Sequence, residues 1–540
     1  MARTYESALS LLSSLQSNKA VTSLFSVPIL PAPASQSSGK PQDLNALAIP
    51  EMLAWLGRAG LSQRDLSQLK CIHVAGTKGK GSVCAFLTSI LVNSSAGTAG
   101  KVGTYTSPHL VSVRERIMID GRPLAPDLFA RYFFEVWDAF TEAARAELGR
   151  KTGLCGDGQE GGERQTPEAE LQGPATKPFY FRFLTILAFH AFLREGVRSA
   201  VVECGIGGEH DSTNVLPAEA VTASVVAPLG IDHVGMLGRT LPEIAWHKIG
   251  VAKAGRRCFT RRLAGDGHDD KAAATMEVLR RRAAERGAEL VEVPDEAVEA
   301  WGGVRADEVG GLEGDFQKYN QALAVCAARE HLRVLASPEQ EDSDKSTAVV
   351  DFSSIPEEFA EGLRKARLRG RCETRQEDSI TWLIDGAHTA ESLREVARWF
   401  ASKRSTATNT RHVLLFNQQE RDAAKLLEGL YSGIQQQSAS TLSPAAIFDK
   451  AAFTRNELQP RSGDEAERDL SVQNAGAQVF ARLSPESQVV VCDNVADVVS
   501  EARKSVPTQG YATEKTIVLV TGSLHLVGAL LRTLEPDSPL

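Results

Sequence analysis

The residues best suited to do chemistry lie in one short segment, Gly76-Thr77-Lys78-Gly79-Lys80-Gly81-Ser82. Its glycines let the backbone turn tightly and direct N–H groups toward one point, as phosphate-binding loops do. Lys80 could reach a β- or γ-phosphate, and the hydroxyl of Ser82 could ligate Mg²⁺. The segment therefore predicts a loop that holds the phosphates of a nucleotide.

The segment departs from the standard phosphate-loop pattern, which requires Gly, four residues and then Gly-Lys-Ser/Thr. Val74 stands where the first glycine should be, and Gly81 separates the lysine from the serine. The alternative is a glycine-rich turn with two solvated lysines. The flanking residues favour the loop, because apolar Cys71–Ala75 predicts a buried strand and Val83–Val92 predicts a helix. A nucleotide at this turn would also meet the positive end of the helix dipole.

Three further candidates follow predicted strands or lie on a helix. Glu203 lies near the end of the apolar run Ala200–Cys204, and His233 follows the run Val221–Ala227. Parallel strands present their carboxyl ends at one edge of a sheet, so both side chains could converge on the glycine loop. Lys248 lies on a predicted helix at 240–254.

Each candidate also has a structural alternative. Glu203 could be an acid satisfied by backbone N–H groups at a strand end. His233 could cap a loop, with the neighbouring Asp232 as the functional group, and Lys248 could be a solvated helix lysine. Taken singly, none of the three carries a functional assignment.

Composition narrows the classes of protein to which the chain could belong. At 540 residues it is too long for one core, so two or more domains are expected. The formal net charge of −8 argues against a general binder of nucleic acids or anionic membranes. No apolar run is long enough to span a bilayer. The eight cysteines are scattered without zinc-ligand spacing, which indicates reduced, mostly buried thiols in an intracellular protein.

Alternating strand and helix patterns predict an α/β fold with a doubly wound parallel sheet. We expect a first, nucleotide-binding domain over residues 1–335 and a smaller α/β domain over 340–540, joined by the polar segment Pro338–Thr347. The alternating run Val111–Ile117 reads as strand-like, and Gly149–Lys177, poor in apolar residues, reads as a flexible insertion. The second domain is expected to contain five strands: Thr381–Ile384, His412–Phe416, Ala445–Phe448, Val489–Cys492 and Thr516–Thr521.

Six ordered motifs over both domains resemble the folylpolyglutamate synthases of the Mur ligase superfamily, in their eukaryotic form. Besides the glycine loop, they are Thr106-Ser107-Pro108-His109-Leu110, Glu203-Cys204-Gly205-Ile206-Gly207-Gly208, Gly230-Ile231-Asp232-His233, Gly370-Arg371-Cys372-Glu373 and Asp385-Gly386-Ala387-His388. The long insertions and Phe416-Asn417 with Arg421-Asp422 favour the eukaryotic form. The resemblance extends from about Pro50 to the segment Val518–Leu526.

The resemblance implies roles for individual residues. Lys80, His233 and Lys248 would act in catalysis, with Ser82, Glu203, His233 and Lys248 around Mg²⁺ and Lys248 as a candidate for carbamylation. The nucleotide would contact the glycine loop and Gln317, Asn320, Arg371, Asp385 and His388. The folate would contact Thr106, Ser107, Pro108, His109 and Arg114. Two positions depart from the family pattern: His247 precedes Lys248 where Glu is usual, and Phe316 stands where His is usual.

The implied reaction joins L-glutamate to the γ-carboxyl of tetrahydrofolate or its polyglutamates. ATP would first phosphorylate that carboxylate, and the amine of glutamate would attack the acyl phosphate inside a closed two-domain site. K⁺ is a further candidate cation, and we expect a monomeric cytoplasmic enzyme with a mitochondrial pool and no nucleic-acid partner or integral membrane segment. The alternatives are a dihydrofolate synthase or bifunctional enzyme, a nucleotide-binding regulatory protein without turnover, and a plain α/β scaffold.

Overall fold

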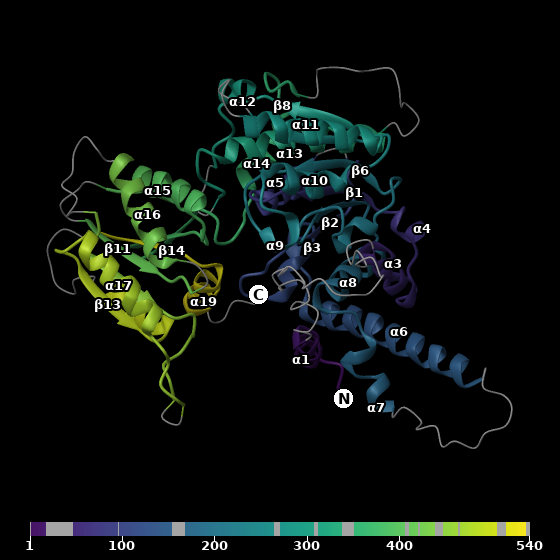
Figure 1. Cartoon of the computed structure of the whole chain (residues 1–540), viewed down its shortest axis with the longest axis horizontal. Coiled ribbons are helices and arrows are strands. Elements are labelled where there is room, and N and C mark those ends of the chain that lie inside the picture. Colours follow the sequence, from purple (N-terminus) through teal and green to yellow (C-terminus); the bar gives the residue numbers. More distant parts are fainter. Residues whose placement is uncertain are drawn as a thin grey trace, which may run out of the picture. The chain divides into compact units, whose positions relative to one another are not determined.

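The computed structural model describes residues 2–17, 47–94, 97–153, 168–263, 270–306, 311–336, 350–405, 410–419, 422–437, 447–462, 465–504 and 515–535. The chain divides into two compact units. The first comprises Met1–Pro108, Arg114–Gly302 and Tyr319–Gly362, and the second comprises His109–Val113, Gly303–Lys318 and Leu363–Leu540. Each unit is built on its own sheet (Figure 1).

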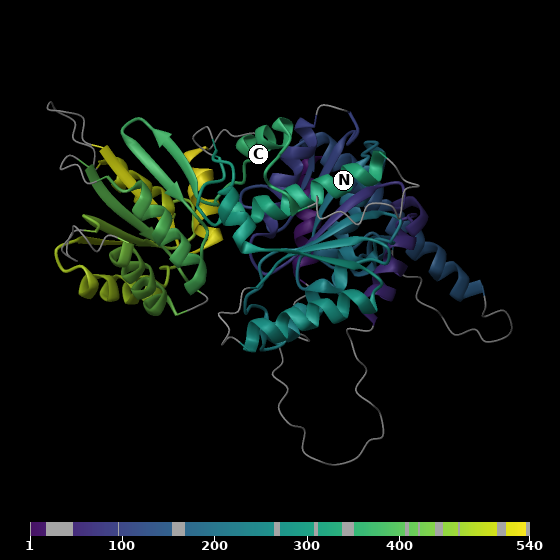
Figure 2. The same ribbon diagram turned by 90° about the horizontal axis from the view of Figure 1, so that it is seen from above.

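The described part of the first unit contains an eight-stranded sheet in the order β4-β3-β2-β5-β1-β6-β7-β8, whose strands lie side by side in Figure 2. Its strands are β1 Lys70–Ala75, β2 Val102–Tyr105, β3 Ile117–Ile119, β4 Arg122–Pro123, β5 Ser199–Glu203, β6 Val221–Val226, β7 Arg257–Arg261 and β8 Glu289–Val293. Along the part of the sheet that runs β2-β5-β1-β6-β7-β8, all neighbouring strands pair in parallel. Strand β3 pairs antiparallel with both β2 and β4. The carboxyl ends of β2, β5, β1 and β6 therefore lie next to one another.

Side-chain caps mark the start of some helices in this unit. Thr240 and Glu243 form a capping box at the start of α10, and Pro242 occupies its first turn. The helices and 3₁₀ turns are α1 Tyr5–Ser14, η1 Leu15–Ser17, α3 Ala48–Arg58, α4 Gln63–Leu66, α5 Lys80–Asn93, η3 Val113–Arg116, α6 Pro126–Gly153, α7 Glu168–Leu171, η4 Pro174–Thr176, α8 Tyr180–Arg194, η5 Ser212–Val215, α9 Val234–Leu237, α10 Leu241–Lys248, η6 Ile249–Val251, α11 Asp270–Glu285, α12 Asp295–Trp301, α13 Gln317–Ala336 and α14 Glu357–Lys365.

Two predictions for this unit were wrong. Val113–Arg116 forms the 3₁₀ turn η3, not a strand, and only Ile117 begins β3. The cause is Arg114, whose buried guanidinium donates to the carbonyl of Leu124 and lies 5.5 Å from the ring centroid of Tyr5. Arg114 and Arg116 are both buried, so the polar positions of this alternation do not mark an exposed strand face.

The segment 149–177 is also not wholly a flexible insertion. Helix α6 extends to Gly153, as the long helix in Figure 1, and the chain from 168 onward packs back onto it. The ammonium group of Lys177 is buried and donates to Thr141 Oγ1 at 2.8 Å and to the carbonyl of Leu171 at 3.1 Å. Trp137 donates its indole N–H to the carbonyl of Gln172. Residues 154–167 lie outside the described part of the chain.

The described part of the second unit contains a six-stranded sheet in the order β13-β12-β11-β14-β10-β9. Its strands are β9 Glu373–Glu377, β10 Ile380–Ile384, β11 Thr410–Phe416, β12 Lys450–Thr454, β13 Gln488–Cys492 and β14 Lys515–Thr521, and its further helices are α15 Ala390–Lys403, α16 Ala423–Gln437, α17 Ser471–Leu483, α18 Val495–Lys504 and α19 Leu524–Leu534. Strand β9 pairs antiparallel with β10 and the other pairs are parallel.

Apolar residues alternate between the two faces of this sheet. In β11, Leu414 and Phe416 join the cluster formed with α15, α16 and α17, whereas Val413 and Leu415 join the cluster formed with α18 and α19. Both faces are therefore covered, and the predicted fold class, an α/β protein with large parallel sheets, is confirmed.

Two details of the second sheet differ from the sequence prediction. Ile447 and Phe448 lie before β12 in the apolar core and not in a strand, so the strand predicted at Ala445–Phe448 was wrong in position. Strand β9 was missed, because its residues, Glu-Thr-Arg-Gln-Glu, are polar and occupy the sheet edge.

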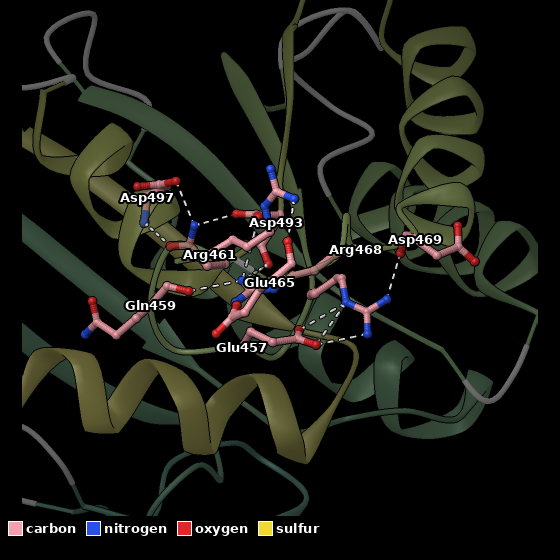
Figure 3. Close-up of polar contacts among 10 residues, drawn as sticks. Glu457, Gln459, Arg461, Glu465, Arg468, Asp469, Asp493 and Asp497 are labelled. Atoms are coloured by element: carbon pink, nitrogen blue, oxygen red, sulfur yellow. Dashed lines mark hydrogen bonds and ion pairs between the residues drawn. The ribbon is translucent and has the colours of Figure 1, made fainter. Parts of the chain in front are cut away.

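The connection between β12 and α17 is polar, and arginine side chains hold its described residues in place (Figure 3). Arg455 pairs with Glu457 at 2.9 Å and donates to the carbonyl of Asp469 at 2.7 Å. Arg468 donates to the carbonyls of Gln459 and Asp493 at 3.0 and 3.1 Å. Since guanidinium groups carry several donors in a fixed geometry, two of them can order a loop that buries little apolar surface.

The compact units divide the chain differently from the sequence-based domain boundaries. Residues 109–113 and 303–318 lie within the predicted first domain, yet they pack in the second unit. Residues 350–362 lie within the predicted second domain, yet they belong to the first unit. The whole of the predicted linker, Pro338–Thr347, lies outside the described residues. No helix among the described residues is long and apolar enough to cross a membrane.

Candidate active site

The glycine loop lies between β1 and α5, as the sequence predicts, and is tied to the segment that follows β6. The backbone N–H groups of Thr77 and Lys78 donate to the carbonyl of Pro228 at 3.1 and 3.0 Å, and Thr77 Oγ1 donates to the carbonyl of Gly230 at 3.0 Å. These two N–H groups therefore brace the loop in the described conformation, in contrast to the expectation that they point at a phosphate.

Two glycines of the loop are required by close contacts. Gly76 has a φ of +145°, and a Cβ there would lie 2.7 Å from Ala227. Gly79 has a φ of +76° and caps α5, and a Cβ there would lie 2.4 Å from Asn320 Oδ1. The helix begins at Lys80, three residues earlier than predicted, so Lys80, Gly81 and Ser82 form its first turn. Lys80 is half-buried and Ser82 is buried at the positive end of the helix dipole.

Lys248 is not a solvated helix lysine. Its side chain is 2% exposed, and Nζ donates to the carbonyl oxygen of Gly76 at 2.8 Å. Burial lowers the pKa of Lys248 to about 7, and the nearby positive charge of Lys80 adds to this effect. The structure thus brings Lys248 to the first glycine of the loop, from 172 residues along the chain.

Glu203 ends β5 beside the loop and is 3% exposed. Its Oε2 accepts a hydrogen bond at 3.0 Å from the backbone N–H of Ser107, which follows β2. The carboxylate therefore links the glycine-loop side of the sheet to the predicted folate loop, and the strand-end acid is satisfied in part by backbone, as its structural alternative proposed.

His233 lies further into solvent than the other candidates. It adopts the left-handed conformation with φ +49°, its side chain is 46% exposed, and its Nε2 lies 3.9 Å from Asp232 Oδ2. Among the described residues, no three His, Cys, Asp or Glu side chains gather closely enough to form a preformed metal cage. Mg²⁺ usually takes only one or two protein ligands beside phosphates and water, so Glu203 and Ser82 still fit such a site.

A buried polar network behind Glu203 was not predicted from the sequence. Asp211 Oδ2 accepts from the N–H of Ile206 at 3.0 Å, and Asp211 Oδ1 accepts from the N–H and the hydroxyl of Thr213 at 2.9 and 2.6 Å. The hydroxyl of Thr213 lies 2.8 Å from His73 Nε2, which lies 3.1 Å from the thiol of Cys204. Asp211 therefore fixes the turn that directly follows Glu203.

Helix α10, which carries Lys248, packs against that same turn. A Cβ on Gly208 would lie 2.7 Å from the carbonyl oxygens of His247 and Lys248. Asn214 donates to the carbonyls of Glu209 and Gly250 at 3.0 and 3.1 Å. The polar run Glu209-His210-Asp211-Ser212-Thr213-Asn214 after the glycines was the available signal, but its side chains could equally have faced solvent.

The predicted folate loop is divided between the units. Thr106, Ser107 and Pro108 belong to the first unit, where the N–H of Thr106 donates to the carbonyl of Arg116 at 3.0 Å, while His109 belongs to the second. Arg114 is buried and bonded to Leu124, so in this conformation it supports the fold and does not line an open site.

The remaining predicted nucleotide contacts lie on α13 and in the second unit. Asn320 packs against Gly79 within the first unit, while Gln317, the first residue of α13, is grouped with the second unit. In the second unit, Asp385 Oδ2 accepts from the N–H of Cys372 and Oδ1 from the N–H of Ala387, both at 2.8 Å. Burial raises the pKa of Asp385, and Arg371 opposes the effect.

Asp385 thus joins the turn after β10 to the segment that carries Arg371. A Cβ on Gly386 would lie 2.9 Å from Arg371 Nη1, so the guanidinium lies directly over this turn. His388 Nδ1 lies 2.9 Å from the carbonyl oxygen of Gly386. The structure brings these three predicted residues together at the carboxyl end of β10.

The described cysteines fit the expectation of reduced thiols. All seven are free, and six of them are buried. Burial raises the pKa of Cys71 and of Cys258 to about 12, so neither thiol is a nucleophile near neutral pH.

Comparisons with known proteins match this chain over its whole length. The chain is 35% identical over 554 residues to the folylpolyglutamate synthase of Neurospora crassa, covering 100% of this chain and 93% of that protein. It is 36% identical over 541 residues to the folylpolyglutamate synthase of Saccharomyces cerevisiae, covering 98% of this chain and 86% of that protein. Residues 368–441 match the family described as the dihydrofolate synthetase C-terminal domain.

The solved structures with the same fold include a folylpolyglutamate synthase from Mycobacterium tuberculosis complexed with ADP and AMPPCP. It is 22% identical to this chain, with a TM-score of 0.60 over 91% of this chain and 96% of that one. At this level of identity the similarity establishes the fold.

Proposed function

Because the chain belongs to the folylpolyglutamate synthase family, we propose that it is an ATP-dependent ligase that adds L-glutamate to the γ-carboxyl of reduced folates. The products are the extended folylpolyglutamate, ADP and phosphate. The observation that carries the proposal is the 35% identity to the Neurospora crassa enzyme over the full chain. The glycine loop, which begins at the carbonyl held by Lys248, supports it independently.

The proposed chemistry overcomes a poor leaving group. A carboxylate would have to expel oxide to form an amide, so ATP first transfers its γ-phosphoryl group to the folate's γ-carboxylate. The amine of glutamate then attacks the acyl phosphate, and phosphate leaves from the tetrahedral intermediate. Lys80 and the first turn of α5 offset the negative charge that develops during phosphoryl transfer.

Glu203 and Ser82 are proposed to hold Mg²⁺ together with the nucleotide phosphates. Both are buried oxygen donors at the carboxyl edge of the first sheet, which suits a hard cation. When bound, the ion would offset negative charge on the phosphates during phosphoryl transfer. We propose that His233 orients a group at the rim of this site, since it is more exposed than the two oxygen donors.

Lys248 is proposed to supply either a neutral amine or a carbamate. Because the pKa of Lys248 is about 7, a large fraction of the protein molecules carry this side chain as a neutral amine near neutral pH. A neutral amine adds CO₂ to give a carbamate and one proton, and the carbamate would be one more anionic oxygen donor for Mg²⁺. Direct mass measurement of the purified protein in bicarbonate buffer tests for the added CO₂.

The test of the function is ADP formation by the purified protein with tetrahydrofolate, L-glutamate, ATP and Mg²⁺. We expect ADP release only when both folate and glutamate are present, and a product whose mass increases by glutamyl units. ADP release without either substrate, or no turnover at all, would contradict the proposal and favour a regulatory nucleotide-binding protein.

A dihydrofolate synthase or bifunctional enzyme is the second candidate. The match of residues 368–441 to the dihydrofolate synthetase C-terminal family favours it. The two activities use the same acyl-phosphate step and differ in the acceptor. Replacing tetrahydrofolate by dihydropteroate in the same assay separates them, because only the second candidate would form dihydrofolate.

A further inference from the structure

The chain that leaves the predicted folate loop is seated on the C-terminal helix of the second unit. Leu110 and Val111 pack on the apolar cluster that contains α18 and α19. Arg532, near the end of α19, donates to the carbonyl of Val111. We use the name "loop seat" for Leu110 and Val111 together with Gly370, Gly528 and Arg532.

Gly528 shows how closely the loop approaches this helix. A Cβ at Gly528 would lie 2.4 Å from the carbonyl oxygen of Leu110, a separation that side-chain atoms do not adopt. Likewise, a Cβ at Gly370 would lie 3.0 Å from Leu110 Cδ1. Both glycines therefore provide room for Leu110.

Helix propensity does not account for Gly528. It lies in the interior of the eleven-residue helix α19, where glycine costs about 1 kcal/mol relative to alanine. The close approach of the Leu110 carbonyl explains why a glycine occupies this position. Gly429, within α16, has no atom within 4 Å of its Cβ position, so glycine in a helix of this unit does not always accompany a close contact.

The other end of the loop is held independently. Ser107 donates its N–H to Glu203, and Thr106 donates its N–H to Arg116. Leu110 directly follows His109 in the chain, so a shift of Leu110 on its seat would also move His109.

We propose that Gly528 and Arg532 are positioning residues for folate, which act by fixing the Thr106–His109 loop through Leu110 and Val111. The inference rests on the proposed function and on the proposed contact of that loop with folate. It assigns to α19 control over folate affinity without any contact of its own with the substrate. The glycine loop and its contacts are not part of the seat, so ATP binding should be separable from this effect.

The test compares Gly528→Ala with the matched control Gly429→Ala in the full chain. Both variants add one methyl group to a helix interior, but only the first meets Leu110. We expect Gly528→Ala to raise KM for tetrahydrofolate about tenfold or more while KM for ATP changes less than about twofold. Gly429→Ala should leave both KM values unchanged.

Arg532 provides a second route if Gly528→Ala does not fold. Arg532→Ala removes the donor to Val111, and Arg532→Lys keeps a cationic donor, so the KM for tetrahydrofolate should rise in the first and recover in the second. Equal rises in KM for ATP and folate, or a fall in Tm with unchanged folate KM, would overturn the positioning role. Absence of turnover by the unmodified protein would instead overturn the proposed function and, with it, this inference.

Discussion

The ammonium group of Lys248 lies 2.8 Å from the carbonyl oxygen of Gly76 and donates a hydrogen bond to it. This contact joins the C-terminal end of α10 to the first residue of the glycine loop. It forms in an interior where burial lowers the pKa of Lys248 to about 7. The backbone carbonyl is a neutral partner, so the contact satisfies the amine without stabilising its charge as a carboxylate would.

Lys248 should make stability depend on pH above neutrality. Its folded pKa of about 7 lies below the ordinary value of 10.5, so between these values the unfolded chain binds a proton that the folded chain does not. The free energy of unfolding then gains up to about 1.4 kcal/mol per pH unit from this group as pH rises. Lys248→Met removes this contribution. When urea unfolding is measured at pH 7, 8 and 9, the unfolding free energy of the variant should therefore rise less steeply with pH. An identical slope would show that Lys248 is not held neutral.

Lys80 is expected to act in the reaction and not in the fold. It is half-buried in the first turn of α5. Lys80→Ala should lower kcat/KM by about a hundredfold, or roughly 2.7 kcal/mol of transition-state stabilisation, with little change in Tm. Lys101→Ala, which removes a surface lysine paired with Glu195, is the control and should retain full turnover. Near-normal turnover by Lys80→Ala would exclude its phosphate role.

Asp211 should be needed both for stability and for activity. Its two oxygens accept three hydrogen bonds, from Ile206 and from Thr213, in a buried site. Asp211→Asn places an amide N–H₂ against one of these donors, which should cost about 1–3 kcal/mol of unfolding free energy. Because the turn after Glu203 would shift, kcat should fall further than the fraction of folded protein.

The control for Asp211 is Asp378→Asn. Asp378 lies in the exposed turn between β9 and β10 with φ +48°, a conformation that asparagine adopts equally well. This variant should match the unmodified protein in both urea unfolding and turnover. If Asp211→Asn behaves in the same way, the buried network does not support Glu203.

The second unit should depend on the segment 303–318, which precedes its main body in sequence. Glu313 accepts from the indole N–H of Trp399 at 3.0 Å and pairs with Lys403 at 2.7 Å. Glu313→Ala should lower the unfolding free energy by about 1–3 kcal/mol, because it leaves a partly buried indole without its acceptor. Urea unfolding measures the change, and Glu395→Ala, which removes the half-buried ion-pair partner of Arg398 within α15, is the control. Equal stability of the two variants would show that the segment is not anchored there.

Sequence patterns predicted the strand ends well and the polar contacts poorly. The glycine loop, Glu203 and the residues after β6 follow apolar strands, and the parallel pairing of β5, β1 and β6 places them at one edge. Periodicity carries that information because strands alternate and parallel strands share their direction.

Sequence periodicity does not identify which polar residues are buried. Arg114 was predicted to contact folate and Asp211 was not singled out, yet both are buried and bonded. Their partners, Leu124 for Arg114 and Ile206 for Asp211, are backbone groups, which every residue carries. The sequence therefore does not indicate which polar side chain will find such a partner.

The segment 149–177 offers the final test of that limit. Its composition predicts that it cannot bury enough apolar surface to order itself, yet Leu171 is buried and Lys177 donates three hydrogen bonds, to Thr141, Leu171 and Thr176. Shortening 155–166, which is rich in glycine and polar residues, should leave Tm and turnover nearly unchanged. Lys177→Met should lower Tm, because Thr141 and the turn at Leu171 lose their shared donor. Equal Tm values for the unmodified protein and Lys177→Met would mean that the free-energy cost of burying the lysine equals the stabilisation from its three hydrogen bonds.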